Sequence, residues 1–187
     1  MCSSPVWSIR PRVAAWLALT RVPRDRRQAI LDAAIAVIAR RGVRGLRVEQ
    51  VAAEADVAVS LIYYYFVNRS GLVRATLDHA NERAKHRAGT SAETMLLAEL
   101  DQSSHDTSVV WGEVLASAVF EPALRDGLRE ASETWTDLVA GALGSREGAE
   151  RLTALVDGLS ARWLAGVITR ERAVELLRGA IAAEATS

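Results

Sequence analysis

The chain has 187 residues, half of them apolar, and its 23 basic and 23 acidic side chains leave no net charge. This length suits one large domain or two small ones that share a core, and the apolar content is ample to build that core. The one cysteine, Cys2, excludes an intramolecular disulfide and any cysteine-based metal cluster, which fits a reducing compartment. We expect neither a metal nor a cofactor.

The first 22 residues show no convincing sign of a fold, and we expect either a flexible arm or a start site placed too far upstream. The apolar run at 13–19 is too short to cross a bilayer. Arginines stand where a signal peptide would have the small residues of its cleavage site, at Arg21, Arg24, Arg26 and Arg27. We therefore expect a cytoplasmic protein with no membrane partner.

Charge is distributed unevenly between the two halves of the chain. Residues 1–90 hold fifteen Arg and Lys against seven Asp and Glu, whereas residues 91–187 hold eight Arg against sixteen Asp and Glu. A basic half joined to an acidic half suggests that one end binds a polyanion. The alternative is a random scatter of solvated surface charge.

Helical periodicity runs through almost every segment after residue 23, and no segment shows sustained alternation with a period of two, so we predict an all-α fold. Gly42 is expected to end the first helix in the left-handed conformation, and Asn68 to cap the fourth. Pro122 suits the first turn of its helix. The predicted helices span about 24–41, 48–55, 59–65, 68–87, 91–102, 107–120, 122–143, 147–166 and 170–184.

Residues 47–66 are predicted to form two short helices joined by a tight turn at 56–57. Small residues at Ala52 and Ala55 let these helices cross the first helix closely. The second short helix presents hydroxyl groups and aromatic rings outward, with arginines beside it. A helix of this size fits a DNA major groove, and adjacent basic side chains neutralise phosphates. The side chains expected to face inward are Val51, Ala52, Ala55, Val57, Ile62 and Phe66.

Residues 24–72 resemble the TetR family of bacterial repressors. The matching features are Ala33, Ala34, Gly42, Leu46, Val48, Val51, Ala52, Ala55, Val57, the block 62–66 (Ile-Tyr-Tyr-Tyr-Phe), Asn68, Arg69 and Leu72. The resemblance implies a three-helix DNA-binding domain with a helix-turn-helix in residues 23–70. It also implies a helical effector-binding and dimerisation domain in residues 71–187. The protein would then be a dimeric repressor that binds a palindromic double-stranded DNA operator and is released by a small-molecule effector.

The resemblance also implies individual DNA contacts. Tyr65 would donate its hydroxyl to a phosphate, and Arg69, where the family usually has Lys, would contact another. Tyr63 would lean on a thymine methyl or the sugar wall, and Glu49 could accept from a cytosine amine. The base edges would be faced by Val59, Ser60, Leu61 and Tyr64. The full predicted DNA-binding set is Arg44, Arg47, Glu49, Val59, Ser60, Leu61, Tyr63, Tyr64, Tyr65, Asn68 and Arg69.

Three positions depart from the family pattern. Arg47 and Ala58 stand where Ser or Thr usually caps each short helix, and a lost cap typically costs about 1 kcal/mol of helix stability. Asp56 replaces the usual Gly of the turn, and Asp tolerates the left-handed conformation better than most residues. We expect a reading head of modest rigidity that depends on arginine–phosphate contacts.

The last two predicted helices have broad apolar faces, and residues 154–164 look like the dimer helix of the family. An apolar helix pair at a chain end can pair with its copy across a two-fold axis. A dimer would place two recognition helices about one DNA turn (~34–36 Å) apart. The alternative is a helix pair buried within one subunit. The predicted interface residues are Leu152, Leu155, Val156, Leu159, Trp163, Val174, Leu177 and Ile181.

The resemblance further implies that helices between residues 91 and 143 enclose an effector pocket. The candidates are Met95, Leu96, Trp111, Leu115, Phe120, Trp135 and Leu138, with ordinary core packing as the alternative for each. Because few charged groups fall on these faces, we expect an apolar or aromatic effector. The switch would change the spacing of the two reading heads through the 68–87 helix.

Other chemistry finds little support. His79, Glu82 and His86 could share a helix face, but the two histidines are two turns apart, too far for a tight metal pair. No P-loop, dinucleotide fingerprint, nucleophile elbow or Cys/His pair is present, so we expect no enzyme. The rival hypotheses are an all-α enzyme or ligand-binding bundle with a degenerate motif, and a helical adaptor that binds protein through its acidic half.

Overall fold

In a computed structural model, residues 23–184 are described, and that range contains α-helices and two short 3₁₀ helices but no strand, which confirms the all-α prediction. The elements are α2 (Pro23–Gly45), α3 (Val48–Glu54), α4 (Val59–Phe66), α5 (Arg69–Arg87), α6 (Ala92–Ala98), η1 (Gln102–Ser104), α7 (His105–Ala118), η2 (Pro122–Leu124), α8 (Arg125–Leu143), α9 (Arg146–Leu164) and α10 (Arg170–Glu184). No helix in this range is long and apolar enough to cross a membrane. The predicted N-terminal arm, residues 1–22, lies outside the described residues.

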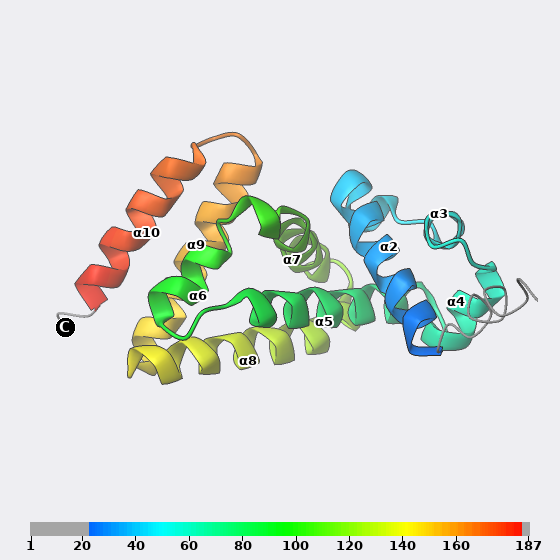
Figure 1. The fold of residues 1–187 in the computed structure, drawn as a ribbon, viewed down its shortest axis with the longest axis horizontal. Helices are drawn as coiled ribbons and strands as arrows, with labels where there is room; N and C mark the ends of the chain where they lie inside the picture. The colour runs from blue at the N-terminus through cyan, green and yellow to red at the C-terminus, as the bar shows by residue number, and fades with distance from the viewer. Residues whose placement is uncertain (1–22, 185–187) are drawn as a thin grey trace, which may run out of the picture.

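The molecule is elongated, with α3 and α4 at one end and α10 at the other (Figure 1). The long helix α5 starts beside α4 and runs with α8 along the length of the molecule, while α7 lies between α2 and α9. This arrangement gives α5 and α7 contact with both ends of the fold.

A first apolar core joins the three N-terminal helices to α5 and α7. The period of α2 places Ile30, Ala34 and Ile38 on one face, and each of them is fully buried. The same cluster includes Val110 and Val114 from α7. The predicted boundary at residue 70 therefore falls inside a shared core, and the division into domains at this residue stays a prediction.

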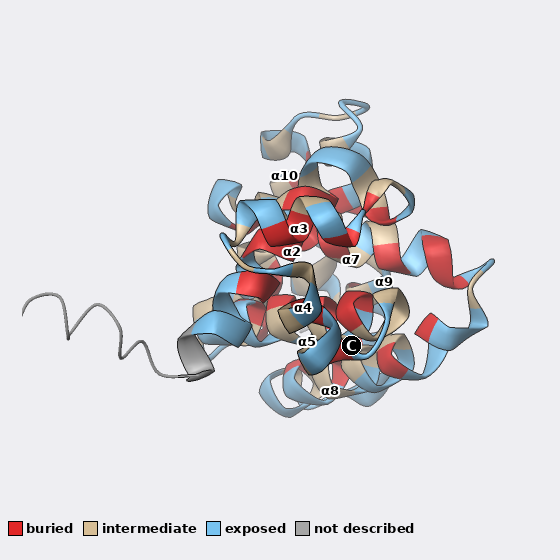
Figure 2. Cartoon of the chain, turned by 90° about the vertical axis from the view of Figure 1, so that its right-hand side faces the viewer, coloured by how far each residue is buried: buried red, intermediate tan, exposed pale blue. Residues whose placement is uncertain are grey.

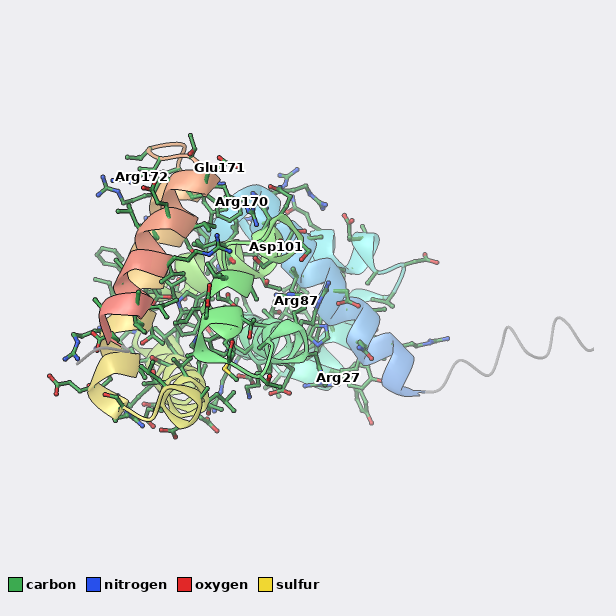
Figure 3. All side chains as sticks on the ribbon, turned by 60° about the vertical axis from the view of Figure 1, so that its left-hand side comes forward. Arg27, Arg87, Asp101, Arg170, Glu171 and Arg172 are labelled. Atoms are coloured by element: carbon green, nitrogen blue, oxygen red, sulfur yellow. The ribbon has the colours of Figure 1, made fainter. Side chains whose placement is uncertain are left out.

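A second core lies between α6, α8, α9 and α10. Leu96, Leu152 and Leu177 are at most 1% exposed within it. Arg170, at the start of α10, connects this core to the segment before η1. Its Nε donates to the Leu100 carbonyl oxygen at 2.6 Å, and Figure 3 shows Arg170 beside Asp101, whose carboxylate lies 3.3 Å from Nη2.

Local backbone features agree closely with the sequence patterns. Gly42 has φ 69° and breaks the helical geometry of α2, and Asp56 has φ 52° in the turn of the helix-turn-helix. The Asn68 side chain accepts from the Gly71 amide at 2.8 Å, which caps α5. Neither Arg47 nor Ala58 makes a side-chain cap, as their residue types predict.

Several helix boundaries differ from the predicted ones by a few residues, and at two places a short 3₁₀ helix causes the difference. The helix expected over 91–102 ends at Ala98, because Asp101 accepts from the Ser103 amide and turns the chain into η1. The helix expected from Pro122 begins with the 3₁₀ turn η2. Periodicity alone does not separate such a turn from a continuous helix.

Candidate nucleic-acid interface and effector cavity

The helix α4 is anchored by one face and presents the other to solvent. Ile62 and Phe66 are 1% and 5% exposed and pack into the first core. Their burial turns Tyr64, 79% exposed, and Tyr63, 46% exposed, outward. Figure 2 looks onto this end of the molecule and shows the exposed surface of α4. The arrangement leaves a short helix free to enter a groove.

The remaining predicted base-reading residues divide by exposure. Ser60 is exposed, whereas Val59 and Leu61 are only partly so and pack against the first core. Glu49 is exposed near the start of α3. The structure therefore gathers the predicted set at one end of the molecule, with Ser60 and Tyr64 as its most outward members on α4.

Basic side chains surround this surface. Arg44 and Arg47 are exposed, and the Arg44 guanidinium lies 5.2 Å from the centre of the Phe120 ring. Arg27, at the start of α2, lies 5.4 Å from the centre of the Phe66 ring, at the end of the molecule opposite α10 (Figure 3). The predicted DNA-binding set left Arg27 out, although the arginine run at the start of the first helix could have indicated it.

Tyr65 and Arg69 lie closer to the protein than the other predicted contacts. Tyr65 is partly buried, and its ring meets that of Tyr64 edge to face at 5.3 Å. Arg69 donates to the backbone carbonyl oxygens of Val43 and Leu46 at the end of α2, and its Nη1 lies 3.6 Å from the Glu121 carboxylate. A phosphate contact by Arg69 stays a prediction, and the structure gives this side chain an internal role as well.

We expect Arg69→Ala to lower the free energy of unfolding by roughly 1–3 kcal/mol, because it removes the side-chain donor to the Leu46 carbonyl and one of the two donors to the Val43 carbonyl. Arg69→Lys keeps the charge but loses the forked donor geometry, so it should recover only part of the loss. Thermal unfolding followed by circular dichroism measures both variants. Equal stability of wild type and Arg69→Ala would contradict the internal role.

A cavity of about 260 Å³ lies between α5, α7, α8 and α9. Glu99, the residue that follows α6, also lines it. Small-molecule sites usually measure ~300–1,000 Å³, so this cavity suits a small ligand. Trp111 and Trp135, two of the residues predicted for the effector pocket, both line this cavity. Thr107, Ser108 and Ser160 add hydroxyl groups to its wall.

The other five predicted pocket residues do not line this cavity. Leu96 is fully buried in the second core and Met95 packs against that core. Phe120 and Leu138 are 71% and 41% exposed and face outward. Leu115 lines a neighbouring hollow that also includes Trp111. The prediction placed the walls between residues 91 and 143, but α5 and α9 supply much of the wall, because α6 packs against α8 and α10 instead.

Three carboxyl groups line the cavity: Glu99, Asp157 and Glu150, of which Glu150 pairs with Arg146 at 3.0 Å. Burial raises the pKa of Glu99 to about 7, against the lowering effect of Arg87, and nearby Asp157 raises it further. Burial raises the pKa of Asp157 to about 6, while the Trp111 N–H partly opposes that rise. The Trp111 Nε1 nevertheless makes no hydrogen bond of normal geometry. The cavity is therefore more polar and more acidic than the sequence pattern indicated.

The predicted dimer residues fall into two groups. Leu152, Val156, Leu159 and Leu177 are at most 5% exposed and pack within the second core. The others, Leu155, Trp163, Val174 and Ile181, are partly buried against the same core. The broad apolar faces of α9 and α10 are thus largely used inside the protomer, and the side chains left for a partner are those at their edges.

A contact between α7 and α2 joins the cavity to the DNA-reading end. Glu113 lies two residues after Trp111 on α7, and its Oε2 accepts from the Val43 amide at 2.9 Å. The same carboxylate lies against Gly42, where an added Cβ would come within 2.5 Å of Oε2. The sequence predicted a coupling through the 68–87 helix, and no local pattern in it indicates this contact.

An exposed α4 in a helix-turn-helix, together with a cavity lined by α5, α7, α8 and α9, is typical of a DNA-binding protein that also binds a small molecule. The family model described as "Bacterial regulatory proteins, tetR family" matches residues 30–76, and "BetI-type transcriptional repressor, C-terminal" matches residues 86–186. The chain belongs to the TetR family of bacterial transcriptional regulators.

Individual relatives agree with this assignment. The HTH-type transcriptional regulator BetI of Cronobacter sakazakii is 27% identical over 165 residues, with 77% of this chain and 80% of the relative covered. A crystal structure of a putative TetR-family transcriptional regulator from Rhodococcus sp. is 38% identical, with a TM-score of 0.78 over 86% of this chain and 99% of that one. The multidrug binding protein EbrR, complexed with imidazole, is 31% identical, with a TM-score of 0.63 over 83% of this chain and 94% of that one. The protein is therefore a ligand-responsive DNA-binding transcriptional regulator.

Proposed function

We propose that the protein is a repressor that binds a palindromic operator in the cytoplasm as a homodimer and is released by a small-molecule effector. The observation that carries this proposal is the exposed face of α4, with Tyr64 outward and Arg44 and Arg47 beside it. An exposed aromatic helix flanked by basic side chains suits a major groove between two phosphate backbones. The family model that matches residues 86–186 is described as that of a transcriptional repressor, which supports the direction of regulation.

A homodimer through α9 and α10 is part of the proposal. Leu176 is 39% exposed on α10, and the small residues Ala154, Gly158 and Ala161 on α9 are exposed at its outward positions. Small side chains allow two helix pairs to approach closely, and a two-fold axis there would build a four-helix interface. The partly buried members of the predicted interface set, such as Leu155 and Trp163, would then border that interface.

Effector release would act through α5 and α7. Both helices line the cavity and both pack against α2, so a ligand that displaces either helix moves the base of the reading head. The bond between Glu113 and the Val43 amide is the direct connection on α7. The crystal structures of EbrR with imidazole and with proflavin support small-molecule binding by this fold.

The test is DNA binding, measured by fluorescence anisotropy on fragments from the region beside the protein's own gene. We expect a specific palindromic fragment, a steep fall in affinity with salt, and two chains per fragment by mass measurement. Arg47→Ala should weaken binding roughly tenfold and reduce the salt slope by about one, as expected for a lost phosphate contact. Tyr64→Ala should reduce the preference for the operator over random DNA by roughly 5- to 100-fold.

The matched control is Arg129→Ala. Arg129 is exposed on α8, away from α4 and outside the helices proposed to form the dimer, and its loss should leave DNA binding unchanged. If Arg47→Ala bound DNA as tightly as this control, the proposed DNA interface would be wrong. If only one chain bound each fragment, the proposed dimer would be wrong.

A further inference from the structure

Arg69, which is predicted to contact a DNA phosphate, is held from three sides by groups of the protein itself. Its Nε donates to the Leu46 carbonyl oxygen at 3.4 Å, and its Nη2 donates to the Val43 carbonyl oxygen. Its Nη1 lies 3.6 Å from Oε2 of Glu121. The two side chains of this ion pair are 33% and 34% exposed, so the pair is open to solvent and to a ligand that arrives from solvent.

Glu121 comes from the ligand-binding domain, where it lies between the end of α7 and η2. Its amide donates to the Ser117 carbonyl oxygen at 2.9 Å, so the residue continues the last turn of α7. Arg125 fixes this turn, because its Nε donates to the Ala118 carbonyl oxygen at 2.9 Å and its Nη2 to the Val119 carbonyl oxygen at 3.0 Å. A movement of the end of α7 would therefore carry this carboxylate with it.

A second carboxylate of α7 completes a ring of contacts around the same place. Glu113 Oε2 accepts from the Val43 amide at 2.9 Å, and the carbonyl group of Val43 accepts from Arg69. The ring runs from α7 through the end of α2 to Arg69 at the start of α5, and returns through Glu121 to the turn after α7. Arg69 is thus the point at which the ligand-binding domain meets a predicted DNA contact.

The charge of Glu121 opposes the binding of a phosphate at Arg69. The carboxylate and a phosphate are both anions, and each lowers the attraction of the guanidinium group for the other. An ion pair with this exposure is weak, so a phosphate can displace it. The two anions therefore compete for one arginine.

We propose that Glu121 is a positioning residue of the DNA interface, which competes with a DNA phosphate for Arg69 and thereby lowers the affinity of this contact. A shift of α7 that carries Glu121 away from Arg69 strengthens the phosphate contact, and a shift toward Arg69 weakens it. The inference rests on the proposed function in one respect, because it needs Arg69 to contact DNA. It adds to the spacing of the two reading heads a second way in which the ligand-binding domain changes DNA affinity.

The test is the DNA affinity of full-length Glu121→Gln, measured by fluorescence anisotropy on the palindromic fragment and on a random duplex of equal length. Removing the competing charge should raise affinity about three- to fivefold at low salt. The plot of log affinity against log salt should become steeper by about one, because one more phosphate is neutralised. Both duplexes should show the change, since a phosphate contact carries no sequence information. A purely structural ion pair would give no gain in affinity when it is lost.

Glu54→Gln is the matched control. Glu54, at the end of α3, lies 2.6 Å from Arg40, at the same end of the molecule, and Arg40 is not among the predicted DNA contacts. The control therefore removes the same charge from an ion pair without freeing a predicted phosphate contact. It should change DNA affinity by less than about twofold.

A double variant shows whether Glu121 acts through Arg69. In the Arg69→Gln background, Glu121→Gln should change affinity by less than about twofold, because the shared partner is gone. The comparison with Glu54→Gln stays decisive if Arg69→Gln does not fold. The proposal would be overturned by equal affinity and salt slope in wild type and Glu121→Gln, by an equal gain in Glu54→Gln, or by an equal gain without Arg69.

These measurements separate the inference from the proposed function. A gain on the random duplex without any specific operator would support the role of Glu121 and contradict the repressor. Specific operator binding with no effect of Glu121→Gln would support the repressor and contradict the role of Glu121.

Discussion

Replacing Gly42 by alanine is expected to lower the free energy of unfolding by about 2–4 kcal/mol. Gly42 has φ 69° and ψ 169°, a backbone conformation that is essentially restricted to glycine and costs other residues roughly 1–3 kcal/mol. A Cβ there would also stand 2.5 Å from the Glu113 carboxylate, which is bonded to the next amide of the chain. Strain and steric conflict therefore act together at this position.

Thermal unfolding provides the measurement. A loss of this size in a chain of this length should lower Tm by about 5–12 °C. Gly112→Ala is the matched control, because Gly112 lies on α7 with open space around its Cβ position, and alanine there should be neutral or slightly stabilising. An unchanged Tm for Gly42→Ala would show that stability does not depend on glycine at this break in α2.

A double variant separates the two causes. Glu113→Ala removes the steric conflict but leaves the backbone strain, so Gly42→Ala combined with Glu113→Ala should recover only part of the lost stability. The pair also connects to regulation, since Glu113 lies on the helix that carries Trp111. We expect a weakened response of DNA binding to effector in Glu113→Ala if α7 is a coupling route.

Local chemistry allowed the reading head to be predicted from the sequence. A positive φ at Gly42, the cap at Asn68 and the exposed rings of α4 follow from residue type, turn geometry and helical period. Each depends on neighbours within a few residues. The inward side of α4 was predictable for the same reason, because Ile62 and Phe66 are four residues apart on one face.

Tertiary contacts were not predictable in this way. The guanidinium of Arg69 finds acceptors 23 and 26 residues earlier in the chain, and a long flexible side chain gives no pattern for such a choice. The same holds for the cavity, because Asn81 and Asp157 come from helices far apart in sequence. They line one cavity only because α5 and α9 both pack against α7 and α8. Periodicity assigns an apolar face to α9, but does not show that this face packs within the protomer and that Asp157 beside it lines a cavity.

The contribution of Glu99 to the free energy of unfolding should fall as pH rises, because its carboxyl is buried. The pKa of Glu99 is about 7 in the folded chain, against 4.5 for an ordinary glutamate. Below pH 4.5 the group is protonated in both states and contributes nothing. Between pH 4.5 and 7 the folded state holds a proton that the unfolded state has released, so the folded state is progressively destabilised. Above pH 7 the full penalty, up to about 3 kcal/mol, is present.

Glu99→Gln removes this titration, so its stability advantage over wild type should be up to about 3 kcal/mol larger at pH 8 than at pH 4.5. Urea unfolding at the two pH values measures the difference. Glu93→Gln, an exposed change on the neighbouring α6, should show no such dependence. A gap between Glu99→Gln and wild type that stays constant with pH would contradict the burial of this carboxyl.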